Sequence, residues 1–189
     1  MSNMVFSVIG SLDGYIADER GNFDWAYPGE EVIAFLNARS EGVTTHLYGR
    51  RMYEMMAVWE TDPAATAQSP ESAAFAEIWK QARKVVYSTT LEAVSTRNTQ
   101  LERTFDPLAV QQIKDESDGD LYIEGPTLAA HAFRAGLVDR VEIVVVPIIV
   151  GGGTRIYPEH VRLDLELDGE QRFTNGMVHL RYRSLRSPT

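Results

Sequence analysis

Three short segments of the sequence combine residue types that bind phosphate groups, and each follows a run of apolar residues. Gly49-Arg50-Arg51 sets two guanidinium groups beside a glycine, and a guanidinium holds phosphate through paired hydrogen bonds. Ser88-Thr89-Thr90 supplies adjacent hydroxyl groups. Gly125-Pro126-Thr127 joins a glycine, which lets a ligand approach the backbone, to a proline suited to the first position of a helix. The chemistry common to these segments is the binding of a nucleotide.

Each segment also has a purely structural explanation. Two adjacent arginines commonly form a solvated face, hydroxyl groups after a strand commonly cap the next turn, and a glycine commonly joins a strand to a helix. Neither the usual dinucleotide fingerprint nor a P-loop occurs in the sequence. The nucleotide interpretation depends instead on the shared position of the segments, because ligands in open α/β sheets collect outside the carboxyl ends of the strands.

The pattern of apolar residues predicts an α/β fold in which strands and helices alternate. Strands are expected at residues 5–9, 44–48, 84–88, 99–105, 121–123 and 141–150. Helices are expected from Pro28 onwards and at residues 50–58, 72–83, 107–116 and 128–135, with loops at 10–24 and 61–70. Strands as rich in β-branched residues as 141–150 are usually buried on both faces. This favours a largely parallel sheet flanked by helices.

The end of the chain alternates polar and apolar residues and carries two turn signals, Asp168-Gly169 and Asn175-Gly176. Asn-Gly between alternating segments is the strongest short signal for a β-hairpin. We therefore expect a C-terminal antiparallel hairpin on the sheet, within a single domain that spans residues 1–189.

Composition excludes several classes of function. The sequence contains no cysteine, so disulfides and thiolate metal sites are excluded, and its histidines lack the spacing of metal ligands. A formal net charge of −9 disfavours nucleic acid as a partner. No apolar run is long enough to span a bilayer, and the first residues lack a signal-peptide pattern. We therefore expect a cytoplasmic protein with no metal and no membrane partner.

The order and spacing of several motifs resemble a known family. Two of them, Ser11-x-Asp13-Gly14-x-Ile16-Ala17 and Leu47-Tyr48-Gly49-Arg50-Arg51-x-Tyr53-Glu54, resemble segments of the dihydrofolate reductase superfamily. The later segments at 124–129, 135–139, 147–153 and 173–182 are more similar to the riboflavin-biosynthesis reductase branch, the RibD C-terminal domain type. The resemblance spans nearly the whole chain.

The resemblance implies a mixed, mostly parallel sheet flanked by helices, with NADPH as the cofactor. By the same resemblance, the residues that would meet NADPH are Gly49, Arg50 and Arg51 at the 2′-phosphate and pyrophosphate, Ser88 and Thr89 at the adenosine 2′-phosphate end, Gly125, Pro126 and Thr127 at the pyrophosphate, and Ile16 and Ala17 at the nicotinamide ribose. Two positions depart from the family pattern. Met52 removes a hydroxyl from the phosphate site, and Glu124 would repel the pyrophosphate unless its side chain points away.

The resemblance also implies where a substrate would bind. Trp25 and Glu30 resemble the pterin-binding segment of dihydrofolate reductases, in which a buried acid supports protonation. In the riboflavin branch, Asp13 would lie near the reacting sugar. Glu30 is also explained as a first-turn acid favoured by the helix dipole, and Asp13 as an Asx turn before Gly14.

The leading expectation is an NADPH-dependent reductase resembling 5-amino-6-(5-phosphoribosylamino)uracil reductase, which passes hydride to a pterin- or pyrimidine-related small molecule. One alternative is a dihydrofolate reductase that uses Glu30 as its acid. The other is a nucleotide-binding protein that kept the fold without catalysis. We also expect a homodimer, supported by the apolar strand near Ile143–Val150 and by the final hairpin.

Overall fold

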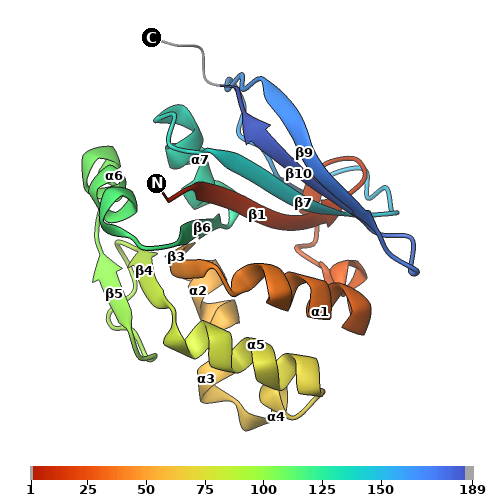
Figure 1. The fold of residues 1–189 in the computed structure, drawn as a ribbon, viewed down its shortest axis with the longest axis horizontal. Coiled ribbons are helices and arrows are strands. Elements are labelled where there is room, and N and C mark those ends of the chain that lie inside the picture. Colours follow the sequence, from red (N-terminus) through yellow and green to blue (C-terminus); the bar gives the residue numbers. More distant parts are fainter. Residues whose placement is uncertain (1, 186–189) are drawn as a thin grey trace.

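The centre of the protein is an eight-stranded, mostly parallel sheet (Figure 1). The computed structural model describes residues 2–185. In spatial order the strands are β5 (Thr99–Glu102), β4 (Arg83–Tyr87), β3 (Val43–Gly49), β6 (Asp120–Glu124), β1 (Met4–Ser11), β7 (Arg140–Val146), β10 (Val178–Ser184) and β9 (Leu165–Arg172). From β5 to β7 all neighbours are parallel, and β10 is antiparallel to both β7 and β9. The predicted fold class is therefore confirmed.

Helices cover both faces of this sheet (Figure 1). One face carries α1 (Gly29–Ser40) and α5 (Pro70–Gln81), and the other carries α6 (Pro107–Glu116) and α7 (Pro126–Arg134). Side chains of a strand point alternately to the two faces. In β7, Val141 and Ile143 pack in the core beneath α6 and α7, whereas Val144 and Val146 pack in the core beneath α1. Burial on both sides explains why this strand is apolar throughout.

Shorter elements occupy the connections. They are β2 (Tyr15–Ala17), η1 (Asp24–Ala26), α2 (Arg50–Met56), α3 (Val58–Thr61), α4 (Pro63–Thr66) and β8 (Thr154–Arg155). The expected loop at 61–70 contains α4 because the Asp62 carboxylate caps it, accepting a hydrogen bond from the Ala64 N–H. The expected loop at 10–24 contains β2, which pairs with β8 in a small second sheet.

The strand expected at 141–150 ends earlier, at Val146. Pro147 has no N–H for the sheet, and the Ile148 N–H instead donates to the carbonyl of Val146 at 2.8 Å. The backbone therefore turns here. The Ile148 carbonyl accepts a hydrogen bond of 2.9 Å from the Leu12 N–H, which joins this turn to the end of β1.

Of the two turns expected near the C-terminus, one is confirmed and one is wrong. Asn175-Gly176 forms the turn between β9 and β10, as expected. Asp168-Gly169 instead lies inside β9, at an irregularity opposite Arg181. The Arg181 side chain ion-pairs with Asp168 at 2.8 Å, and a Cβ on residue 169 would lie 3.2 Å from its guanidinium. The glycine makes room for this side chain and does not mark a turn.

A buried ionic cluster joins α1 to the sheet. Glu142 of β7 accepts hydrogen bonds of 2.9 and 2.6 Å from Arg39 of α1, and its carboxylate lies 3.3 Å from Nε2 of His179 in β10. The side chains of Glu142 and His179 are both only 4% exposed. Burial alone would raise the pKa of Glu142, but the hydrogen bonds from His179 and Arg39 outweigh it and hold the pKa at about 2.

Candidate functional site

The structure brings together, at one edge of the sheet, the three segments that the sequence predicts to bind phosphate. Gly49 ends β3, Ser88 follows β4, and Gly125 follows β6. These three strands are parallel neighbours, so their carboxyl ends lie side by side. A hydrogen bond of 3.1 Å from Arg50 Nη1 to the Thr90 hydroxyl joins two of the segments directly. The three segments predicted to follow strand ends therefore lie side by side at this edge.

The segment after β4 is a tight, locally bonded turn. The Ser88 hydroxyl is buried and accepts hydrogen bonds from the N–H groups of Thr90, at 3.2 Å, and Leu91, at 2.9 Å. Arg103 holds the same turn by donating to the carbonyls of Ser88 and Leu91. Thr89 and Thr90 are exposed. Ser88 therefore shapes the turn, and the threonine hydroxyls are the groups that face solvent.

The segment after β3 presents two arginines at the start of α2. Arg50 ion-pairs with Glu54 one helical turn later, at 2.8 Å, and its side chain remains 46% exposed. Arg51 is exposed, and among residues 2–185 no carboxylate pairs with it. Gly49 is the N-cap of this helix. An exposed guanidinium without a protein partner is available for an anion of a ligand.

The segment after β6 turns sharply into α7. Gly125 is the N-cap, with φ of +87°, a conformation that other residues rarely adopt. Pro126 is the first helical residue, and the first intrahelical bond joins the Ala129 N–H to the Gly125 carbonyl at 3.0 Å. The N–H groups of Thr127 and Leu128 precede that bond. They are the donors that a helix start offers to phosphate.

Glu124 does not face these donors. Its carboxylate lies 2.9 Å from Nδ1 of His46 on β3, and the two side chains are 14% and 4% exposed. Since Ile123 packs under α7, Glu124 points to the opposite face of the sheet. Burial, and next the Glu124 charge, raise the pKa of Tyr48, whose hydroxyl also accepts from Trp79 at 3.0 Å. The Glu124 carboxylate therefore lies away from the N–H groups at the start of α7.

The first loop is held against a segment far away in the sequence. The Asp13 carboxylate accepts hydrogen bonds from the N–H groups of Val150, at 3.2 Å, and Gly151, at 2.8 Å. The Tyr15 N–H, which an Asx turn at Asp13 would use, donates instead to the Ser11 hydroxyl at 2.9 Å, so the expected Asx turn before Gly14 does not form. The hydrogen bond with Ser11 lowers the pKa of Asp13 most, and the bonds from Gly151 and Val150 lower it further. The carboxylate therefore stays ionised at neutral pH.

The other residues expected near the nicotinamide and the substrate lie in or beside this loop. Ile16 packs against the core beneath α7, and Ala17 is buried. Trp25 is half-buried over the core beneath α1 and donates to the carbonyl of Asn22 at 3.1 Å. Glu30 is exposed in the first turn of α1. Its exposure differs from the buried acid that pterin protonation requires.

Gly153 determines how closely β8 approaches β2. Its φ is +126°, and a Cβ there would lie 2.1 Å from the Ala17 carbonyl oxygen. Gly151 also has positive φ, +79°, but a Cβ there would meet nothing within 4 Å. We expect Gly153→Ala to reduce the free energy of unfolding by about 1–3 kcal/mol more than Gly151→Ala, because only the former displaces backbone.

Urea unfolding of both variants, with hydrogen exchange of the β2 amides, measures this difference. The φ of Gly153 lies farther from the left-handed region than that of Gly151, so backbone strain adds to the same difference. Equal losses, with β2 protected to the same extent in both, would show that the contact with Ala17 carries no weight.

Two surface hollows differ in their relation to this edge of the sheet. The smaller, about 180 Å³, lies beside the start of α7 and is lined by Pro126, Thr127, Thr154, Arg155, Tyr157 and Pro158. The larger, about 590 Å³, lies at the opposite edge, where β4 and β5 begin, and is lined by Gln81, Arg83, Asn98, Thr99 and Gln100. Of the two, the smaller hollow adjoins the segment after β6, and Arg155 lies in its lining.

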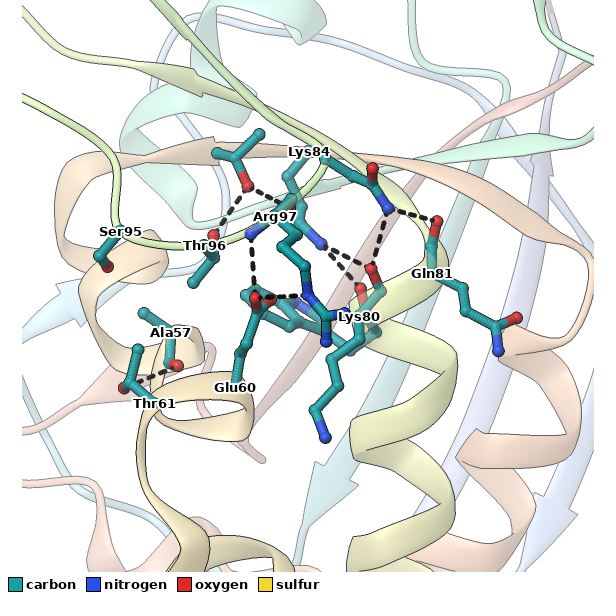
Figure 2. A network of polar contacts seen from close by, with 12 residues as sticks. Ala57, Glu60, Thr61, Lys80, Gln81, Lys84, Ser95, Thr96 and Arg97 are labelled. Carbon is teal, nitrogen blue, oxygen red and sulfur yellow. Dashed lines mark hydrogen bonds and ion pairs between the residues drawn. The ribbon is translucent and has the colours of Figure 1, made fainter.

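The surroundings of the larger hollow serve the fold (Figure 2). Arg97 donates to the Glu60 carboxylate at 3.0 Å, and Lys84 donates to the carbonyls of Trp79 and Lys80 at the end of α5. Burial lowers the pKa of Lys84 to about 8, because the ammonium group has lost water. The Lys84 contacts cap α5, and the Arg97–Glu60 pair ties α3 to the turn before β5, so the site is better placed at the carboxyl edge.

Within the described part of the chain, no group of side chains is arranged to hold a metal ion. None of the helices in residues 2–185 has the length and apolar character needed to cross a membrane.

Sequence reasoning missed two features of this site. One is the pair formed by His46 and Glu124. Its signal in the sequence is a single polar residue in each of two apolar strands, and the two residues face the same side of the sheet. The other is Arg155, which follows the glycine run 151–153. Arg155 reaches the site because β8 runs toward α7, and no local sequence pattern predicts the course of the chain there.

Solved structures with this fold include proteins of riboflavin biosynthesis. A putative riboflavin biosynthesis protein from Shewanella sp. PV-4 is 24% identical over 98% of this chain and 100% of its own, with a TM-score of 0.75. A diaminohydroxyphosphoribosylaminopyrimidine deaminase/5-amino-6-(5-phosphoribosylamino)uracil reductase from Thermotoga maritima is 15% identical over 97% of this chain, with a TM-score of 0.64. This chain spans only 56% of that protein.

A dihydrofolate reductase from Enterococcus faecalis, solved with NADP(H), is 11% identical over 97% of both chains, with a TM-score of 0.61. At these identities the likenesses show the fold, which is dihydrofolate reductase-like. A search of curated proteins gave no match. A family model described as the RibD C-terminal domain matches residues 3–179. The match covers most of the chain and confirms the resemblance seen in its motifs: the protein belongs to the RibD C-terminal domain family.

Proposed function

We propose that the protein is an NADPH-dependent reductase resembling 5-amino-6-(5-phosphoribosylamino)uracil reductase. The observation that carries this proposal is the set of phosphate-binding groups at the adjacent ends of β4, β3 and β6. The Thermotoga protein is described as a reductase of that kind, and the Enterococcus protein was solved with NADP(H). The acceptor we favour is the open-chain sugar of a phosphorylated ribosylaminopyrimidine.

The residues at this edge fit NADPH along its length. Arg50, Arg51 and the exposed hydroxyl of Thr89 would meet the 2′-phosphate, with Ser88 shaping their turn. Gly49 and the start of α7, from Gly125 to Thr127, would hold the pyrophosphate, and Glu124 is turned away from it. Ile16 and Ala17 would border the nicotinamide ribose. When bound, NADPH supplies the hydride.

The protein's own part in the reaction is to align donor and acceptor. In favourable cases such alignment contributes about 7–11 kcal/mol to lowering the barrier. We place Asp13 above the reacting sugar, where its ionised carboxylate would orient a hydroxyl group or stabilise a developing cation. Trp25 would form part of the substrate wall. The absence of cysteine is compatible with a reducing cytoplasm, where we propose that the protein acts.

The exposure of Glu30 disfavours the dihydrofolate alternative, because that alternative needs a buried acid beside the bound heterocycle. A non-catalytic nucleotide-binding protein would bind NADPH without oxidising it. A screen of NADPH oxidation with phosphoribosylaminouracil and with dihydrofolate separates the three. We expect turnover with the former only. NADPH binding without any turnover would favour the non-catalytic alternative.

The role of Asp13 has its own test. Asparagine keeps the size of the side chain but loses the charge and one of its two acceptor oxygens. We expect Asp13→Asn to lower turnover about 10- to 100-fold, within the range for a group that acts in the transition state. NADPH affinity and melting temperature should change little, because the residue is exposed. Unchanged turnover would show that Asp13 takes no part in the reaction. A large fall in melting temperature would show that its role is to hold the first loop in place.

We also propose a homodimer that pairs through the C-terminal hairpin. Within the expected stretch Ile143–Val150, β7 lies between β1 and β10 and its side chains are mostly buried, whereas Ile149 beyond its end is 71% exposed. The hairpin offers a free surface, because β9 is an edge strand on which Leu165 and Leu167 are 36% and 48% exposed.

A further inference from the structure

Arg155 is held beside the start of α7 by a contact with the first loop. It pairs with Tyr15 across the small sheet of β2 and β8, and its guanidinium carbon lies 5.8 Å from the centre of the Tyr15 ring. An arginine over an aromatic face is attracted to the ring and keeps its donors available. The side chain is therefore positioned by a contact that leaves its N–H groups unused.

No acidic side chain of the described residues forms an ion pair with Arg155. The protein has 27 Asp and Glu residues against 18 Lys and Arg, so a carboxylate partner would be easy to supply. Yet within residues 2–185 no carboxylate pairs with the Arg155 side chain, which interacts with the Tyr15 ring. The guanidinium of Arg155 therefore has N–H donors available for an anionic ligand.

The hollow beside Arg155 contains donors and no carboxylate. Its lining combines the Arg155 guanidinium and the hydroxyls of Thr127 and Thr154 with prolines and the partly exposed Tyr157. Its volume of about 180 Å³ leaves room for a phosphate group with its first waters, and the hollow is open to solvent.

We propose that Arg155, with Thr127 and Thr154, forms a phosphate-binding subsite of the catalytic cleft. This subsite rests on the proposed function for the identity of its ligand. The phosphate belongs either to the acceptor sugar, which the proposed function places beside Asp13, or to the nicotinamide half of the cofactor, whose pyrophosphate it places at the start of α7. In either case Arg155 selects for phosphorylated ligands.

Arg155→Gln tests the subsite, and Arg162→Gln is its matched control. Arg162 follows in the same segment, is 88% exposed, and lies outside the hollow, so the control loses the same charge. Titrations of inorganic pyrophosphate, NADPH and adenosine 2′,5′-bisphosphate give affinities, and phosphoribosylaminouracil gives KM and kcat. We expect Arg155→Gln to weaken one phosphate ligand about 10- to 100-fold, because a lost charge-assisted contact has that effect.

The pattern of losses identifies the source of the phosphate. Weaker NADPH with unchanged adenosine 2′,5′-bisphosphate assigns the subsite to the cofactor's nicotinamide side. A raised KM with nearly constant kcat and unchanged NADPH assigns it to the acceptor. Pyrophosphate binding that depends on Arg155 in a protein without reductase activity would keep the subsite and reject the proposed function. Equal behaviour of Arg155→Gln and Arg162→Gln toward every ligand overturns the subsite.

Discussion

The double variant Arg50→Ala, Arg51→Ala should bind NADPH at least about 100-fold more weakly than the wild type, while its affinity for NADH changes little. Charge-assisted hydrogen bonds contribute about 1.5–3 kcal/mol each, and each 1.4 kcal/mol is a tenfold change in affinity. Both guanidinium groups lie at the start of α2, and Arg50 already reaches across to Thr90 at the end of β4. NADH lacks the 2′-phosphate that these groups would meet.

Fluorescence titration of both cofactors measures this preference. A double variant at Arg134 and Arg162 is the matched control, because both side chains are exposed and neither lies at the carboxyl edge of the sheet. The control should retain the wild-type ratio of NADPH to NADH affinity. Equal losses for the two cofactors in the Arg50, Arg51 variant would show that these arginines do not bind the 2′-phosphate.

Glu142→Gln should cost on the order of 3–5 kcal/mol in the free energy of unfolding at neutral pH. The substitution keeps the shape of the side chain but leaves Arg39 facing a neutral amide in a buried site. Removing one partner of a buried ion pair has a cost in this range. Glu166→Gln is the control: Glu166 pairs with Arg183 on the surface and is 50% exposed, so we expect a loss below about 1 kcal/mol.

The cost of Glu142→Gln should depend on pH with a definite sign. The pKa of Glu142 is held at about 2, below the ordinary value of 4.5, so its ionised form stabilises the folded state above that ordinary value. This stabilisation is lost as the pH falls from about 4.5 to about 2. Urea unfolding across this range should show the gap between wild type and variant closing. A gap that stays constant would contradict the assigned role of the carboxylate.

The parts of the fold that follow from local patterns were predictable. Runs such as Thr44–Tyr48 and Leu121–Ile123 identify strands by their apolar character, and Gly125-Pro126 marks the start of a helix. Because parallel strands end at the same edge, the meeting of the segments after β3, β4 and β6 followed from the strand assignments alone. The site was located by this topological rule.

Other features depend on contacts between distant residues. Asp13 bonds to Gly151, 138 positions away, and nothing in its own loop shows this. The Glu124 side chain is oriented by His46 on a neighbouring strand. The need for a glycine at position 169 is explained only by the Arg181 side chain that lies over it. Arg155 joins the site through the pairing of β2 with β8. In each case tertiary packing overrides or completes the local signal.

The most direct test of the account follows deuterium from NADPH labelled at the transferred position of the nicotinamide. The purified protein would be incubated with labelled NADPH and phosphoribosylaminouracil, and the product would be analysed by mass spectrometry and NMR. We expect one deuterium at the former anomeric carbon of the reduced sugar, and no labelled product from dihydrofolate. Label found only in tetrahydrofolate would contradict the proposed reductase activity. So would recovery of unlabelled phosphoribosylaminouracil together with bound, unoxidised NADPH.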